Sequence, residues 1–139
     1  MRRMARRAPL AATLIALLVL AGCESPSGAQ VEECDTSWRG LEPRIVTGAS
    51  GERQSVPIAC MRAIDERRIS IGFEMPPGPD CYELAAVELE ESADAAAVTL
   101  VVSLVDNAGG SCPTEPVRTV TEVDLQSPVA DRTLLDGSR

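Results

Sequence analysis

The sequence predicts an all-β fold: a small antiparallel β-sandwich-like domain with two disulfides, preceded by a signal peptide and a flexible tether. Six or seven short runs of β-prone residues are separated by turn signals every 8–12 residues, and no segment has a convincing helical pattern. The run 69–75 alternates strictly between apolar and polar or small residues, which indicates a strand. Four cysteines beyond the N-terminal region, an even number, are typical of disulfides in an exported chain.

The first half of the domain contains two expected strands before the clearest one. Residues 44–47 are a short β-prone run that ends at the small residues 48–51. Residues 55–64 form the next run, in which Pro57 allows only an edge position or a strand start because it has no N–H donor. Residues 60–67 also fit a short helical turn, and the sequence leaves this alternative open.

The run 69–75 is the clearest strand of the chain. Ile69, Ile71, Phe73 and Met75 share one face, because side chains alternate between the two sides of a strand. We expect a hairpin between this strand and the run 56–64, with a turn at 65–66. Residues 76–80 contain three prolines, which cannot continue a β-ladder, so they form a surface loop.

The second half contains a hairpin and two further strands. Residues 82–91 alternate between inward apolar and outward acidic side chains, and residues 92–94 turn the chain. Residues 98–105 are apolar on both faces, which is typical of a central strand. A flexible connector, 106–111, precedes the strand 117–125. Pro128 interrupts the chain after this strand, and residues 131–136 form a last short strand or turn.

Cys34, Cys60, Cys81 and Cys112 allow three disulfide pairings. We expect Cys34–Cys60 and Cys81–Cys112, because a hairpin of strands 82–91 and 98–105 brings Cys81 and Cys112 to the same end. Each bridge closes a loop of roughly 30 residues and contributes about 3–4 kcal/mol in the chain-entropy model. Zinc is the competing interpretation, but the sequence has no Cys-x-x-Cys pair and no histidine. We therefore expect no metal and no cofactor.

The composition excludes several classes of function. Without residues 1–22 the chain has nine arginines and 21 acidic residues, a net charge of −12. This charge argues against a nucleic-acid partner and against direct adhesion to anionic head groups. The chain has no histidine and no lysine, which excludes Ser-His-Asp and Ser-Lys catalysis. We expect no catalytic residue and no enzyme.

The first 22 residues have the parts of a signal peptide. Four arginines precede an apolar run of 11 positions, 10–20, which is too short for a membrane span of roughly 20 residues. The sequence Leu20-Ala21-Gly22-Cys23 that follows resembles the lipobox of bacterial lipoproteins. The resemblance implies cleavage between Gly22 and Cys23 and a diacylglycerol on the Cys23 thiol. A further acyl chain, palmitate for example, is added in some members of that family.

The lipobox implies three segments: a signal peptide, 1–22; a lipidated Cys23 with its tether, 23–33; and an extracytoplasmic β domain, 34–139. Residues 24–33 are rich in Pro, Gly, Ser and acidic side chains, and they carry too few apolar groups to offset the entropy of ordering. We expect them to form a flexible tether that lifts the domain off the membrane. The location implied is the extracytoplasmic face of the cell membrane, which the chain contacts through its lipid.

The C-terminal part contains a set of residues in a recognisable order: Glu90-Glu91, Val98-Thr99-Leu100, Val123-Asp124-Leu125, Pro128, Arg132-Thr133-Leu134-Leu135 and Asp136-Gly137. This order resembles a recurrent segment of small exported proteins of actinobacteria, a β domain of unknown function. The resemblance covers about residues 69–137 and implies an exported β domain without an assigned activity.

Several side chains are candidates for a site. Glu88 and Glu90 lie on one strand face with Tyr82 as a possible flank, an arrangement used in glycoside chemistry, although a solvated acidic face is the favoured interpretation. A calcium site would use Glu90-Glu91, Asp94 and Asp106-Asn107, but the D-x-D-x-D-G spacing is absent. We expect Arg132 to be a structural clamp rather than an anion site, and Trp38 to pack as a lid rather than serve as a ligand platform.

The function expected from these observations is a lipid-anchored, non-catalytic cell-envelope β domain that binds a protein or an envelope component. Its contacts are first sought on the loops 76–80 and 106–111, because binding residues concentrate on loops held by a rigid scaffold. The alternatives are a purely structural envelope lipoprotein without a ligand, and a hydrolase that uses acidic residues.

Overall fold

The computed structural model describes residues 25–36, 38–43, 45–46, 51–76, 81–105, 112 and 115–139. These residues contain strands and no helix, which confirms the all-β prediction. The described part of the chain therefore has no helix long and apolar enough to cross a membrane. The strands are β1 (Ala29–Gln30), β2 (Arg53–Val56), β3 (Ile58–Ala63), β4 (Arg68–Met75), β5 (Tyr82–Glu91), β6 (Ala95–Leu104), β7 (Val117–Asp124) and β8 (Thr133–Asp136).

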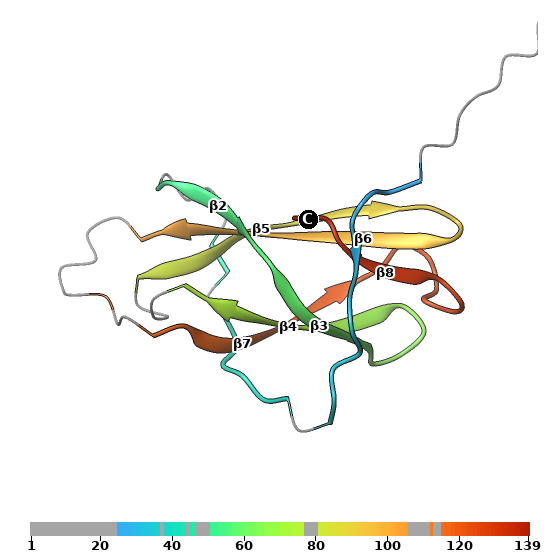
Figure 1. Cartoon of the computed structure of the whole chain (residues 1–139), viewed down its shortest axis with the longest axis horizontal. Coiled ribbons are helices and arrows are strands. Elements are labelled where there is room, and N and C mark those ends of the chain that lie inside the picture. The colour runs from blue at the N-terminus through green and yellow to red at the C-terminus, as the bar shows by residue number, and fades with distance from the viewer. Residues whose placement is uncertain are drawn as a thin grey trace, which may run out of the picture.

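The strands form two sheets that lie face to face (Figure 1). The large sheet is built around β6, which pairs with β5 along one edge. Two strands share its other edge: β8 pairs with the first half of β6 and β2 with the second half. The short strand β1 pairs with β8. The small sheet has the order β3-β4-β7 and is antiparallel throughout.

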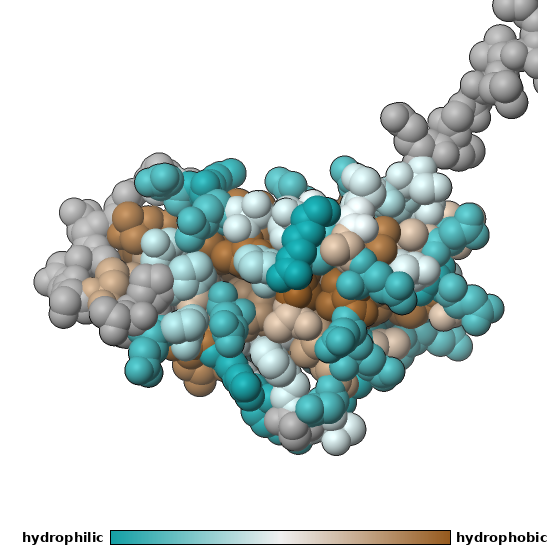
Figure 2. Space-filling view, in the orientation of Figure 1, coloured by the Kyte–Doolittle hydropathy of each residue, from teal (hydrophilic) through white to brown (hydrophobic). Residues whose placement is uncertain are grey.

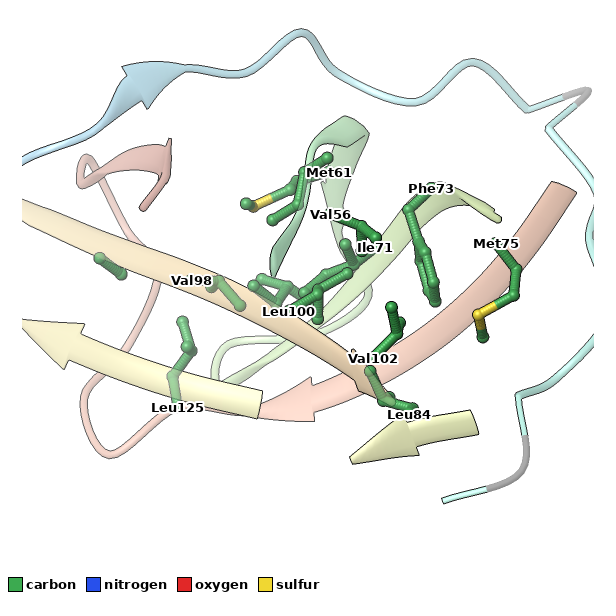
Figure 3. Packing of buried hydrophobic residues seen from close by; sticks show 13 residues of the cluster. Val56, Met61, Ile71, Phe73, Met75, Leu84, Val98, Leu100, Val102 and Leu125 are labelled. Carbon is green, nitrogen blue, oxygen red and sulfur yellow. The ribbon is translucent and has the colours of Figure 1, made fainter. Parts of the chain in front are cut away.

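The core fills the space between β4 and β6, whose inward side chains point toward one another in Figure 3. It is aliphatic apart from Phe73 and the two methionines, Met61 and Met75. Burial of one such side chain contributes about 1.5–3 kcal/mol. The largest fully buried apolar side chains are Ile69, Ile71, Phe73, Met75, Leu84, Val98, Leu100 and Val102.

The expected run 55–64 is divided between the two sheets. Its first two residues end β2 in the large sheet, and β3 begins in the small sheet at Ile58. Figure 1 shows the green chain crossing from one layer to the other at this point. Pro57 lies at the crossing because it has no N–H to donate to a ladder. The predicted hairpin of β3 and β4 is confirmed, whereas the helical turn at 60–67 is wrong, because β3 continues to Ala63.

A buried carboxylate fixes the crossing between the sheets. Asp136, at the end of β8, is 1% exposed, and its Oδ2 accepts a hydrogen bond of 2.9 Å from the backbone N–H of Ile58. Its Oδ1 accepts from the N–H and the hydroxyl of Ser138, and Arg139 Nε lies 3.3 Å from Oδ2. Both carboxylate oxygens thus accept hydrogen bonds, so this carboxylate is buried without an unmet polar group.

The other expected strands are confirmed with small changes of their ends. β5 has the bounds expected, the turn 92–94 follows it, and β6 is a central strand that begins at Ala95 rather than at residue 98. β7 ends one residue earlier than expected, and the last run forms β8. One pair departs from the antiparallel prediction: β8 is parallel to β6. The reason is that β7 ends where β6 begins, so the chain enters the large sheet at the start of β6 and runs alongside it.

Both predicted disulfides are present. Cys34–Cys60 joins the N-terminal segment to β3, with a Cα–Cα distance of 4.8 Å. Cys81–Cys112 joins the start of β5 to the segment before β7, at the end of the sandwich where β6 finishes. Their separations along the chain, 26 and 31 residues, give each bridge about 3–4 kcal/mol in the chain-entropy model.

The described residues between Val31 and Val46 form a strap around the small sheet. The strap pairs with the free edge of β3 through Glu33 and Met61, and then with the free edge of β7 through Leu41 and Thr119. It ends beside β5, where Ile45 pairs with Leu84 and the N–H of Val46 donates to the Leu84 carbonyl. The expected strand 44–47 is thus reduced to one bridge, and Arg44 and Thr47 lie outside the described residues.

Part of the segment expected to be a tether, 24–33, is paired with the domain in the structure. Ala29 and Gln30 form β1, and Glu32 and Glu33 pair with Met61 of β3. The domain therefore begins by Ala29 rather than at Cys34. Backbone hydrogen bonds to β8 and β3 order this segment. These bonds supply the stabilisation that its few apolar side chains do not.

Trp38 lies on the outer face of the small sheet and holds the strap against it. Gly72 of β4 faces outward beneath the indole, and a Cβ at this glycine would overlap the indole and lie 2.8 Å from Cys60 Sγ. The Arg118 guanidinium lies 4.8 Å from the indole centroid, a cation–π distance. Trp38 therefore packs as a lid, as expected, and its contacts with Gly72 and Arg118 occupy the ring.

Gly72→Ala should destabilise the protein by about 1–3 kcal/mol, because the new methyl group overpacks the contact between strap and sheet. Urea unfolding of the oxidised chain measures this loss. Ser70→Ala, two residues earlier on the same face, is the matched control and should change the midpoint little. Equal midpoints for Gly72→Ala and Ser70→Ala would contradict the tight packing of Trp38 on Gly72.

Candidate functional site

Three connections meet at one end of the sandwich, here called the turn end: the bend 64–67 between β3 and β4, the turn 92–94 between β5 and β6, and the segment 125–132 between β7 and β8. Backbone hydrogen bonds join the first and third, from Leu125 N–H to the Arg67 carbonyl and from Val129 N–H to the Glu66 carbonyl. Figure 2 shows mostly hydrophilic side chains around this end, on the right of the molecule. A pocket of about 690 Å³ opens here, lined by residues 91–94, 126–128 and 130–132.

An ion pair forms the inner wall of this pocket. Arg132 Nη1 lies 2.9 Å from Glu91 Oε2, and the two side chains are only 5% and 11% exposed. Glu91 also accepts hydrogen bonds from the backbone N–H groups of Gln126, at 2.7 Å, and Ser127, at 3.2 Å. The last residue of β5 is thereby fastened to the segment that leads into β8.

The Arg132 guanidinium is committed to structural contacts. Besides Glu91 it donates to the carbonyls of Ala95, at 3.0 Å, Ser127, at 3.2 Å, and Pro128, at 3.4 Å. Its Nε is buried and has no acceptor among the described residues. The expected role as a structural clamp is confirmed, and the acidic partner of Arg132 is Glu91.

Two effects compete in setting the pKa of Glu91. Burial by itself would raise it, but the Gln126 N–H, the Arg132 guanidinium and the Ser127 N–H together outweigh burial and hold the pKa below its ordinary value. The carboxylate is therefore ionised at neutral pH, as the ion pair requires.

The pocket presents carboxylates and backbone groups to a ligand. Asp94 and Asp131 are exposed at its rim, and Ala130 has a left-handed backbone with a φ of 36°, a conformation that favours glycine. Glu91, one of the residues considered for calcium, pairs with Arg132 instead, while Asp106 and Asn107 lie outside the described residues. Within the described ranges, no group of three or more His, Cys, Asp or Glu side chains is placed to hold a metal ion.

Tyr82 does not lie beside the acidic pair Glu88 and Glu90 of β5, where the sequence placed it. Glu88 and Glu90 are exposed on the outer face of the large sheet. The pairing of β5 with β6 shifts register between Leu84 and Ala86, so the residues before the shift face the opposite way. Tyr82 therefore packs against the core, on the other side of the sheet from Glu88 and Glu90.

The other expected contact and lipidation residues are mostly beyond the described part of the chain. Gly22 and Cys23 lie just before its first residue, Ser25. Pro76 follows β4 and is described, but the remainder of the loop 76–80 and the whole of 106–111 lie outside the described residues. The pairing of Glu91 with Arg132 was not predicted, because the two residues are 41 positions apart and no local spacing signals their contact.

Comparisons of the chain with protein-family models, with curated proteins and with solved structures find no match.

The Glu91–Arg132 pair should make stability depend on pH. Because the folded pKa of Glu91 is lowered, its contribution is fully present above the ordinary value of 4.5 and is lost as the pH falls through the folded value. Glu91→Gln should therefore be clearly less stable than the parent at pH 7, and the difference should narrow at about pH 3. Arg132→Ala should cost about 3–5 kcal/mol at neutral pH, because it leaves a buried carboxylate unpaired.

Urea midpoints at both pH values check this prediction. Asp65 also has a lowered pKa, first because it accepts a 2.9 Å hydrogen bond from the Arg67 N–H, so acid weakens the parent for more than one reason. The comparison therefore uses Glu88→Gln, an exposed glutamate on the same strand, as the control. A gap between parent and Glu91→Gln that is the same at both pH values would contradict the role given to the ion pair.

Proposed function

We propose that this chain is a bacterial, actinobacterial-type lipoprotein: a lipid-anchored, non-catalytic β domain on the extracytoplasmic face of the cell membrane that binds a protein or another envelope component. The observation that carries the proposal is the lipobox-like Leu20-Ala21-Gly22-Cys23, which ends two residues before the first described residue of the domain, Ser25. Two acyl chains on such a cysteine give stable attachment to a bilayer, whereas one chain gives only marginal binding.

The disulfides support a location outside the cytoplasm. Cys34 and Cys60 are 7% and 6% exposed, and Cys81 is 4% exposed, so these bridges are part of the folded domain rather than accessible redox groups. Structural disulfides of this kind form and persist in oxidising compartments. With Cys34, Cys60, Cys81 and Cys112 paired, Cys23 is the one cysteine of the sequence left for a lipid.

The composition supports a binding role over catalysis. The chain has no histidine or lysine to serve as a general base, and Glu91, the most buried acid of the pocket, is held ionised by Arg132. A net charge of −12 on the chain without residues 1–22 favours partners with a basic surface.

Cys23→Ser should release the protein from the membrane, because the thiol that carries the diacylglycerol is removed. We expect the parent to sediment with membranes and the variant to appear in the soluble exported fraction. Intact mass of the parent should show cleavage before Cys23, added acyl mass, and the loss of four hydrogens for two disulfides. Equal membrane sedimentation of parent and variant would overturn the lipid anchor.

Cross-linking in intact cells tests the binding role. A carbodiimide suits this chain, because it has 21 carboxylates but no lysine, so bonds form between its acids and the lysines of a neighbour. We expect a reproducible adduct of the anchored parent that is lost with Cys23→Ser. If repeated experiments yield only the uncoupled chain, a binding role fails and the purely structural alternative is favoured.

A further inference from the structure

We infer that the turn end faces the membrane, so that the lipid head groups lie against the turn 92–94 and the segment 126–131, while the end with Cys81–Cys112 points away from the bilayer. This inference rests on the proposed lipid anchor at Cys23. It adds the orientation of the domain and identifies the surface that a zwitterionic lipid layer covers.

The chain between Cys23 and the domain has a short reach. Cys23 precedes Ser25 by two residues, which span at most about 7 Å even when fully extended. Residues Ser25–Ser27 line a hollow of about 300 Å³ together with Glu90 and Glu91, the last two residues of β5. Figure 1 shows this blue chain end on the right of the molecule, above the turn end. The lipid is thus tied to the corner of the domain next to the turn 92–94.

The segment after Ser27 is fixed to the large sheet. Gly28 approaches β8 so closely that a Cβ would lie 2.7 Å from the Asp136 carbonyl oxygen. Ala29 and Gln30 then pair with Asp136 and Leu135. Residues 28–30 are therefore part of the domain and do not act as a free spacer. The domain cannot swing away from its anchor as it would on the longer tether expected from the sequence.

The sandwich is long compared with that reach. β6 has ten residues and spans about 33 Å, and it runs from the turn end to the end with Cys81. The reach of about 7 Å is much shorter than this span, so the anchor can hold one end at the head groups but not both.

The turn end combines paired acids with two exposed ones, Asp94 and Asp131, which contact with head groups leaves hydrated as long as the domain does not insert. Glu91 is neutralised by Arg132, and Asp65 and Glu122 both lie within ion-pair distance of Arg68. If the large sheet lay flat on the bilayer instead, exposed acids along its outer face would be covered, among them Glu88 of β5, with which no described residue forms an ion pair. Covering them there would cost desolvation energy without compensation.

Paramagnetic relaxation by a gadolinium head-group lipid tests the orientation. The full lipidated protein, labelled with ¹⁵N, is placed in phosphatidylcholine nanodiscs with a small fraction of that lipid. We expect the amide signals of Ala93, Asp94, Ser127 and Ala130 to relax several-fold faster than those of Arg53, Cys81 and Val117. Three results would each overturn the inference. They are a uniform relaxation enhancement, an enhancement that is strongest at the Cys81 end, and an enhancement at Thr99 and Val101, on the outer face, that equals the one at the turn end.

Two variants separate this inference from the proposed function. A ten-residue Gly-Ser insertion between Glu24 and Ser25 should reduce and level the enhancement, because the reach then no longer selects an end. If the insertion leaves the pattern unchanged, the chain length does not orient the domain and the inference is wrong. Cys23→Ser should give no enhancement at any position. A parent that does not associate with the nanodiscs would refute the lipid anchor itself, whereas an anchored parent with uniform enhancement would refute the orientation alone.

Discussion

The contact between β4 and β6 across the two sheets is the interaction on which the rest of the structure depends. β4 contributes the period-two row from Ile69 to Met75, and β6 contributes Val98, Leu100 and Val102, all at most 2% exposed. These side chains are mainly aliphatic, so tight packing takes the place of aromatic area. Every other element is positioned by this layer: β2 and β8 flank β6, and β3 and β7 flank β4.

A two-layer domain of this size leaves strand edges open, and the strap closes several of them. Exposed edges invite pairing with other chains, and the strap covers β3 at Met61, β7 at Thr119 and β5 at Leu84 with backbone hydrogen bonds. The Cys34–Cys60 bridge and Trp38 on Gly72 hold it in place. The first disulfide and the single tryptophan thus serve the same purpose, which is to keep an irregular segment on an otherwise solvent-facing sheet.

The sequence was sufficient for features whose cause is local or periodic. The row 69–75, the hairpin of β5 and β6 and hence the Cys81–Cys112 pairing follow from alternation and turn residues. Features that join distant segments carried no such signal: Arg132 meets Glu91, and Asp136 meets Ile58, only once both sheets exist. The register shift that turns Tyr82 inward, and the parallel β8, are set by tertiary pairing. β1 was assigned to the tether because its residues are poor in apolar groups, whereas backbone pairing orders it.

The negative charge of the domain favours a position away from an anionic membrane, whereas the proposed anchor holds the domain close to it. A net charge of −12 without residues 1–22 gives the domain no attraction to an anionic leaflet, and repulsion within about 8 Å, the Debye length, would favour distance. A long flexible spacer would let the domain follow that repulsion. Here β1 is paired with β8, and Gly28 lies against the Asp136 backbone, so the chain is fixed to the sheet from a point five residues after Cys23. The ordering of these few residues, rather than any attraction between protein and lipid, is therefore what would keep the turn end at the membrane surface.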